Sequence, residues 1–232
     1  MKILKKDLQI AIDGPVGAGK SVGAHRLAQR LGILYVYTGA MYRATALLGI
    51  KNNVDLQKEN QLIALLKKSK IDLKPASKKT RVCDVFLNSK DVTEDLFSSQ
   101  VHWGSSVVAI LPQVRKYLVK LQQEISQNRA VVMEGRDITT VVLPQADLKI
   151  YMTADLKIRA ERRREDLQKR GEKKTLDQVI EETVKRDYQD SHRRVDPLKI
   201  AQDAWVLDTS NLTVDQEVDL IIERLRQKKL IE

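Results

Sequence analysis

Short apolar runs recur along the chain, and most are separated by longer segments with helical periodicity. The runs are LQIAI at 8–12, LYVY at 34–37, AVVM at 130–133, LKIYM at 148–152 and AWVLD at 204–208. Such runs are typical of strands that are buried on both faces of a parallel sheet. Their alternation with helices predicts an α/β fold, in which a five-stranded parallel sheet flanked by helices binds ligands at the carboxyl ends of its strands.

The intervening segments place apolar residues three and four positions apart, as amphipathic helices do. Thr38 is suited to cap a helix through MYRATALLG, and Pro112 is suited to the first turn of a helix at 112–126. Further helices are expected at 55–69, 93–111 and 213–229, and Gly104 weakens the second of these.

The segment from 70 to 93 breaks this alternation. It reads KIDLKPASKKTRVCDVFLNSKDVT, with short β-like alternation around turn-forming residues. We therefore expect a small β insertion between the second and third strands of the main sheet.

The balance of charge narrows the classes of partner. The chain has 232 residues and a net charge of +10, which predicts either a nucleic acid or phosphorylated small molecules as partners. No apolar run approaches the ~18–20 residues of a membrane span, and MKILKKDLQI at the start lacks the apolar core of a secretion signal. Because Cys83 is the single cysteine, we expect a cytoplasmic protein in which it is a small buried side chain.

Residues 14–21, GPVGAGKS, satisfy the pattern G-x-x-x-x-G-K-[ST] of a phosphate-binding loop, or P-loop. The loop follows an expected strand and precedes a segment with helical periodicity, which is the order that the motif requires. Glycines let backbone N–H groups turn toward phosphate oxygens, and the helix N-terminus adds its positive dipole. Lys20 is expected on the β- and γ-phosphates of a nucleoside triphosphate, and the Ser21 hydroxyl on Mg²⁺. The expected nucleotide-binding residues here are Gly14, Pro15, Val16, Gly17, Ala18, Gly19, Lys20, Ser21 and Val22.

Arginines and acids gather in four further groups. They lie in YTGAMYR at 37–43, EGRDITT at 134–140, RAERRREDLQKRG at 159–171 and KRDYQDSHRR at 185–194. The second group follows a strand, where Arg136 can bind phosphate and Asp137 can accept hydrogen bonds from a base or sugar. Arg–Asp pairs on helices are otherwise usually surface ion pairs, and the group at 159–171 alone would also fit a solvated face or a nucleic-acid patch.

Phosphoryl transfer explains these arginines better than nucleophilic catalysis does. The transferring group spreads charge over its oxygens, so catalysis depends on positioning and on electrostatic stabilisation. The three histidines lie far apart in the sequence, and no Ser-His-Asp or Cys-His arrangement is evident. The stretch 159–171 is expected to close as a lid over the phosphoryl donor. Trp103 and Trp205 are expected to pack in the core or in a cleft rather than to stack on bases.

Together these segments resemble the bacterial cytidylate kinases, which are nucleoside monophosphate kinases. The resemblance runs in order over about residues 8–225 and rests on IAIDGPVGAGKS, TGAMYR, LPQVR, EGRDITTVVLP, RAERRR, KRDYQDSHR and AWVLDTSNLT. It implies a P-loop kinase fold with a small β-containing insertion that binds the monophosphate and a helical lid. The implied divisions are a core of about 1–60, 105–158 and 172–232, an insertion of about 61–104 and a lid of about 159–171.

The resemblance also implies roles for the residues that match the family's motifs. Charge on the transferring group would be stabilised by Lys20, Arg136, Arg162 and Arg163, and ATP would also meet Arg159 and Arg170 of the lid. The implied substrate-binding residues are Thr38, Tyr42, Arg43, Ser106, Arg115, Arg136, Asp137, Arg186, Asp190 and Arg193.

The sequence departs from the family's pattern at three places near these residues. Tyr37 stands where the family usually has aspartate, and Thr139 stands where it commonly has glycine. The segment QVHWGSS carries His102, Trp103 and Gly104 where smaller polar residues are usual.

The implied activity is phosphorylation of CMP and dCMP by ATP and Mg²⁺ through direct in-line transfer. The implied enzyme is a monomer with small-molecule nucleotides as partners, and with no membrane or stable nucleic-acid partner. A P-loop kinase for another small acceptor would explain the loop but not the ordered arginine groups. An NTP-dependent nucleic-acid-binding protein would suit the net charge, but the aromatic residues, 4% of the chain, are scattered rather than gathered along a groove.

Overall fold

The protein is described by a computed structural model over residues 1–78 and 81–232. Residues 79 and 80 belong to the segment expected as a β insertion and lie outside the described residues. The chain divides into two compact units, which we call unit 1 (Met1–Leu34 and Asn128–Glu232) and unit 2 (Tyr35–Gln127). The P-loop sequence lies in unit 1, and the expected β insertion lies in unit 2.

The main sheet contains five strands over the described residues, each starting within one residue of its apolar run. They are β1 (Gln9–Asp13), β2 (Leu34–Tyr37), β6 (Val131–Glu134), β7 (Leu148–Thr153) and β8 (Trp205–Asp208), in the order β2-β6-β1-β7-β8. Strand β1 pairs in parallel with β6 and β7, and β7 pairs in parallel with β8. This arrangement confirms the predicted α/β class, and it places the carboxyl ends of β6, β1 and β7 side by side.

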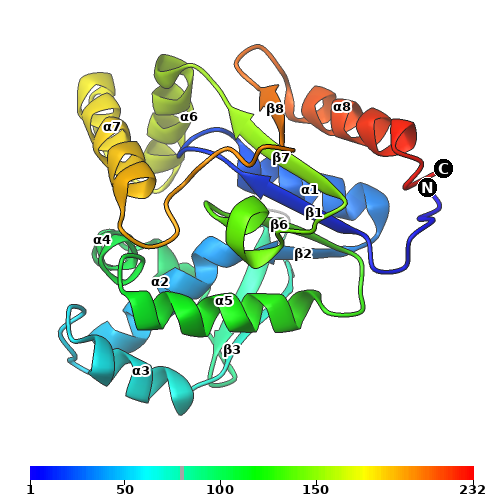
Figure 1. Cartoon of the computed structure of the whole chain (residues 1–232). Coiled ribbons are helices and arrows are strands. Elements are labelled where there is room, and N and C mark those ends of the chain that lie inside the picture. The colour runs from blue at the N-terminus through cyan, green and yellow to red at the C-terminus, as the bar shows by residue number, and fades with distance from the viewer. Residues whose placement is uncertain (79–80) are drawn as a thin grey trace. The chain divides into compact units, whose positions relative to one another are not determined.

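Two helix pairs belong to unit 1. They are formed by α1 (Lys20–Leu31) with α8 (Val214–Gln227), and by α6 (Leu156–Lys169) with α7 (Leu176–His192) (Figure 1). Helices α7 and α8 each begin with a capping box, in which a threonine and a glutamine satisfy the first backbone N–H groups. Helices α6 and α7 pack through Ala160, Leu167 and Val179. The second pair therefore has a small apolar core of its own.

Unit 2 is mainly helical and carries a small antiparallel sheet. Its helices are α2 (Thr38–Lys51), α3 (Glu59–Lys67), the 3₁₀ turn η1 (Glu94–Phe97), α4 (Ser99–Val108) and α5 (Pro112–Ser126). Its sheet has the order β3 (Ile71–Pro75), β4 (Cys83–Leu87), β5 (Lys90–Asp91), which confirms a β segment where the alternation breaks. The apolar core gathers residues from α2 to α5, and Cys83 is buried and forms no disulfide, as expected.

Three expectations in unit 2 were wrong in detail. The helix expected at 93–111 is divided at Ser98, whose side chain accepts a hydrogen bond from Val101 N and so starts α4 anew. Thr38 is the first residue of α2 rather than its cap, because Tyr37 occupies the cap position. Trp103 does not pack in a core, since 60% of it is exposed.

Gly104 lies inside α4 for a packing reason. A Cβ at this position would lie 2.6 Å from Leu56 Cδ1 and 3.1 Å from Ala46 Cβ. The glycine therefore lets α4 approach α2 closely, at the cost of weaker helix propensity.

None of the helices found over residues 1–78 and 81–232 is long and apolar enough to cross a membrane.

Candidate functional site

The P-loop connects the end of β1 to the start of α1, as the motif predicts. Gly14, Gly17 and Gly19 all have positive φ, at 149°, 78° and 85°. A Cβ at Gly14 would lie 1.9 Å from Met152 O, and one at Gly17 would lie 2.6 Å from Arg159 O. Both contacts are with backbone oxygens, which cannot turn aside as a side chain can. Two of the glycines are therefore required by close packing against β7 and α6 as well as by their backbone conformation.

Lys20 is buried at the first position of α1, and its Nζ donates to Pro15 O at 2.6 Å. Burial, together with the positive charge of Arg136, lowers the pKa of Lys20 to about 7. Glu134 and Asp13 oppose this effect but do not outweigh it. A buried ammonium group with a lowered pKa is stabilised when an anion binds beside it.

Ser21 has a partner that the sequence analysis missed. Its Oγ donates to Glu134 Oε1 at 2.8 Å, and Glu134 is the last residue of β6, with only 2% of its surface exposed. Hydroxyl and carboxylate oxygens are ligands that Mg²⁺ accepts. The described residues contain no group of three acidic, histidine or cysteine side chains that could hold a metal ion without other ligands. A metal at this pair would therefore complete its coordination with water or phosphate oxygens.

Asp13 is a second acid for which the sequence analysis assigned no role. Its carboxylate accepts hydrogen bonds from Ile138 N at 2.9 Å, from Thr139 N at 2.7 Å and from Thr139 Oγ1 at 2.6 Å. Burial raises the pKa of Asp13 to about 6, although these hydrogen bonds oppose the shift. Asp13 thus fixes the π-helical turn η2 (Ile138–Val142) that follows Arg136 and Asp137. A glycine in place of Thr139 would lack the third hydrogen bond.

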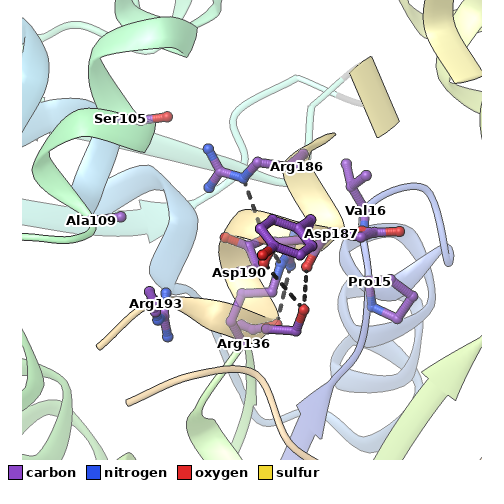
Figure 2. A network of polar contacts seen from close by, with 12 residues as sticks. Pro15, Val16, Ser105, Ala109, Arg136, Arg186, Asp187, Asp190 and Arg193 are labelled. Carbon is purple, nitrogen blue, oxygen red and sulfur yellow. Dashed lines mark hydrogen bonds and ion pairs between the residues drawn. The ribbon is translucent and has the colours of Figure 1, made fainter. Parts of the chain in front are cut away.

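Arg136 and Arg186 meet on one buried acid, Asp190 (Figure 2). Asp190 Oδ2 accepts from Arg136 Nε at 2.8 Å and from Arg186 Nε at 3.2 Å. Burial would raise the pKa of Asp190, but the two guanidinium groups outweigh it and lower that pKa. The predicted groups 134–140 and 185–194 therefore converge, and the carboxylate fixes the directions of both guanidinium groups.

Arg193 and Asp137 lie beside this cluster. Arg193 Nη2 is 3.5 Å from Asp137 Oδ1, and Arg193 also donates to Asp196 O. Both side chains are almost wholly buried, with 4% and 7% of their surfaces exposed. Two residues predicted to bind the substrate are thus held in one ion pair in unit 1.

The arginines of α6 that were predicted to lie in a lid differ in their contacts. Arg159 Nη1 donates to Val16 O at 3.0 Å and to Asp187 Oδ2 at 2.5 Å, while its Nε donates to Ala154 O. Arg162 donates to Thr209 O at 2.6 Å and to Thr209 Oγ1 at 3.0 Å. Arg163 follows it on α6, and Arg170 is the C-cap residue of that helix. Arg159 and Arg162 therefore have protein partners in the state described, and phosphate binding by either one would exchange these hydrogen bonds.

The predicted substrate-binding residues of unit 2 lie on α2, α4 and α5. Arg43 of α2 places its guanidinium carbon 5.6 Å from the centre of the Tyr37 ring and 5.3 Å from that of Phe97. Tyr37, which departs from the family's pattern, therefore forms one of two cation–π contacts to Arg43.

Arg115 of α5 is the other arginine predicted in this unit. It is 1% exposed, donates to Ala109 O at 3.0 Å and lies 5.7 Å from the centre of the Tyr42 ring. Ser106 lies on α4, and Thr38 begins α2. Within this unit the structure brings Arg115 and Tyr42 together.

Glu217 is a buried acid on α8 that the sequence analysis took as part of a plain amphipathic helix. Only 2% of it is exposed, and its Oε2 would lie 3.1 Å from a Cβ at Gly23 and 3.7 Å from one at Gly19. Burial raises the pKa of Glu217 to about 7, and the charge of Arg162 opposes the shift. Gly19, at the N-cap of α1, and Gly23, within α1, therefore leave the space that this carboxyl group fills.

We expect Glu217→Gln to stabilise the protein at pH 8 but not at pH 5. The carboxyl group is protonated in both folded and unfolded states below its unfolded pKa of about 4.5, and its folded pKa is higher, so wild-type stability falls as pH rises toward 7. Glutamine stays neutral, which gives a gain of ~1–3 kcal/mol at pH 8. Thermal melting at both pH values measures the difference, with exposed Glu223→Gln as the control. An equal gain at both pH values would contradict the assignment.

Comparisons with known proteins show which proteins this chain is similar to. A family model described as Cytidylate kinase matches residues 10–227. The cytidylate kinase of Caldanaerobacter subterraneus subsp. tengcongensis is 42% identical over 220 residues, which cover 95% of this chain and 95% of that protein. The cytidylate kinase of Anoxybacillus flavithermus is 44% identical over 219 residues, which cover 94% of this chain and 96% of that protein. A solved structure of an uncharacterized protein from Eubacterium ventriosum has a TM-score of 0.54 at 12% identity, covers 96% of this chain and 99% of that one, and shows a likeness of fold alone.

Proposed function

Because this chain belongs to the cytidylate kinase family, we propose that it transfers the γ-phosphoryl group of ATP directly to the phosphate of CMP or dCMP. A phosphate oxygen of the acceptor forms the new bond to phosphorus as the bond to the β-phosphate breaks, so the products are ADP and CDP or dCDP. The observation that carries this proposal is the placement of the P-loop and Arg136 after adjacent parallel strands, with Lys20 buried beside both.

The P-loop residues Gly14 to Ser21, with Val22 after them, hold the triphosphate. Backbone N–H groups and the N-terminus of α1 face its oxygens, and Lys20 neutralises part of its charge. Arg136 adds a second fixed cation just after the neighbouring strand β6, and Arg159, Arg162, Arg163 and Arg170 of the proposed lid supply others. Such an array suits phosphoryl transfer because the developing charge is on oxygen atoms and no protein nucleophile is needed.

Mg²⁺ fits the oxygen pair formed by Ser21 and Glu134. The Oγ–Oε1 hydrogen bond shows that the two oxygens already point at each other, and both groups suit a hard divalent cation. When bound, the ion would neutralise β- and γ-phosphate charge. Ser21 and Glu134 would be the residues of this chain that hold the ion.

We propose acceptor-binding residues separately for each unit. In unit 1 they are Arg136, Asp137, Arg186, Asp190 and Arg193, where the buried acids supply acceptors for an amino group or for ribose hydroxyls and the arginines suit a phosphate. In unit 2 they are Thr38, Tyr42, Arg43, Ser106 and Arg115, where the cation–π contacts restrict the arginines to defined directions.

Location, assembly and partners complete the proposal. A single cysteine that forms no disulfide suits a reducing compartment such as the cytoplasm. We propose a monomer that binds small nucleotides and has no stable nucleic-acid partner, since the positive charge of the site is explained by phosphates.

The experiment that tests this function measures ADP formation from ATP and Mg²⁺ with CMP, dCMP, UMP, AMP and GMP offered separately. We expect strong turnover with CMP and dCMP and weak turnover with the purine monophosphates. A site built to hydrogen-bond a substrate amino group rejects an analogue that lacks it, so UMP should be the poorer pyrimidine substrate. Equal turnover with UMP would contradict the proposed contacts of Ser106, Arg115 and Asp137 with the cytosine base. No turnover with any acceptor would refute the proposed activity.

A further inference from the structure

The backbone of Val16, in the middle of the P-loop, is held on both sides by charged side chains of unit 1. Its N–H donates to Asp187 Oδ1 at 3.1 Å, and its C=O accepts from Arg159 Nη1 at 3.0 Å. Asp187 lies on α7 and Arg159 on α6, and the two side chains also pair with each other at 2.5 Å. The backbone of Val16 and the side chains of Asp187 and Arg159 therefore each contact the other two. Val16 and Asp187 are labelled in Figure 2.

The ion pair between Arg159 and Asp187 is largely shielded from solvent. The Arg159 side chain is 10% exposed and that of Asp187 is 22% exposed. Arg159 Nε also donates to Ala154 O, so the guanidinium group has a fixed direction. Charge-assisted hydrogen bonds of this kind are stronger than neutral ones. The two side chains therefore hold the loop more firmly than turn residues alone would.

A second, independent observation places the loop against α6. A Cβ at Gly17 would lie 2.6 Å from Arg159 O and 2.9 Å from Arg159 Cβ. The loop thus packs against the backbone of the same residue whose side chain holds Val16. Any shift of Arg159 is transmitted to two neighbouring positions of the loop.

We propose that Asp187 is a positioning residue for the phosphoryl donor, which acts by fixing the P-loop at Val16 together with Arg159. The inference rests on the proposed function, in which ATP binds this loop. Asp187 does not touch the nucleotide in this proposal. It keeps the N–H groups of the loop aimed at the phosphates before ATP arrives, and so lowers the cost of ordering the loop on binding.

The same helix links this contact to the Arg136 cluster. Asp190 lies three residues after Asp187 on α7 and accepts from Arg136 and Arg186. Residues three apart on a helix lie on neighbouring parts of one face. Helix α7 therefore sets both the P-loop and Arg136 from one rigid element (Figure 2).

Two substitutions separate the hydrogen bond to Val16 from the ion pair. Asp187→Asn keeps an acceptor for Val16 N but removes the charge that faces Arg159, and Asp187→Ala removes both. We expect Kd for ATP, measured by calorimetry without any acceptor, to rise about tenfold in Asp187→Ala and less in Asp187→Asn. KM for CMP should change less than about twofold, because the Asp190 cluster is intact in both variants.

The control is Glu181→Gln, an exposed acid on the same helix, which should leave Kd for ATP and melting temperature unchanged. Melting curves identify any variant that fails to fold. If Asp187→Ala does not fold, the proposal is tested with Asp187→Asn alone, because asparagine has the same shape as aspartate. Wild-type ATP affinity in a folded Asp187→Asn and Asp187→Ala pair would overturn the proposal. Tighter ATP binding would also overturn it, because Asp187 would then compete with phosphate for Arg159.

The binding measurement is independent of catalysis. If wild-type protein binds ATP but phosphorylates no pyrimidine monophosphate, the proposed function fails while the role of Asp187 in holding the loop is still tested. Parallel increases in KM for ATP and CMP in both variants would indicate a general structural role and would count against a positioning role at the donor.

Discussion

Lys20→Ala is expected to lower kcat for CMP phosphorylation by about 10²–10³-fold, the size of effect seen when one fixed donor to developing charge is removed. Lys20 is buried beside Arg136, and its Nζ contacts Pro15 O within the loop. Alanine leaves the backbone of the loop in place but removes the cation that we propose for the β- and γ-phosphates. KM for CMP should change little, because the acceptor residues are not altered.

Proton uptake gives this prediction a second measurement. Because burial lowers the pKa of Lys20 to about 7, most of the free protein has a neutral Lys20 at pH 8, and a bound triphosphate raises that pKa again. Wild-type protein should therefore take up protons when it binds ATP at pH 8, which calorimetry in buffers of different ionisation enthalpy detects. The uptake should be smaller in Lys20→Ala and unchanged in exposed Lys228→Ala. Near-normal turnover in Lys20→Ala would refute the role of this lysine.

The regular elements could be predicted because local signals determine them. Helix α5 runs from Pro112 to Ser126, as the apolar spacing and the proline predict. The helix expected at 93–111 failed because a local side-chain cap competes with helix continuation, and Ser98 ends one element and begins the next. Periodicity alone does not identify such an internal start.

The P-loop and the arginine groups could also be located, but not the acids that organise them. Asp13 and Glu134 are each the polar residue that directly follows an apolar run. Nothing in their sequence neighbourhood indicates which groups they contact. Their roles depend on the order of strands, because β6 lies beside β1 and places Glu134 next to Ser21. The available signal was an acid at the carboxyl end of a core strand, the edge at which α/β sheets bind ligands.

Burial on a helix was harder to predict than helix formation. The pattern of α8 places Val218, Ile221 and Leu225 toward the core, and it leaves Glu217 looking like one more charged residue of a capped first turn. The carboxyl group is nevertheless buried, because glycine stands at the N-cap of α1 (Gly19) and within α1 (Gly23) rather than larger side chains. Space left by a neighbouring helix depends on tertiary packing. The apolar pattern of one helix therefore does not predict it. The lid arginines pose the same problem, since sequence spacing does not show that Arg159 holds Val16 while Arg162 holds Thr209.

Gly14→Ala is expected to abolish more than about 99% of ATP-dependent turnover and to cost several kcal/mol of stability. The residue has φ of 149°, which alanine rarely adopts, and its Cβ would lie 1.9 Å from Met152 O. Met152 is in β7, which pairs with β1 on one side and β8 on the other, so the oxygen cannot move without breaking the sheet. The strain and the overlap each cost ~1–3 kcal/mol. A loop displaced by ~1 Å loses about 10²-fold in rate because the phosphates are no longer aligned.

The matched control is Gly32→Ala, which makes the same change at another glycine of positive φ. Gly32 has φ of 68° at the end of α1, but a Cβ there would have no atom within 4 Å. This control therefore carries the conformational cost of roughly 1 kcal/mol without the collision, and it should retain turnover. Denaturant unfolding and steady-state kinetics on both variants separate backbone strain from steric overlap. If the two variants lose stability and activity to the same extent, the close approach of the P-loop to β7 does not determine the geometry of this site.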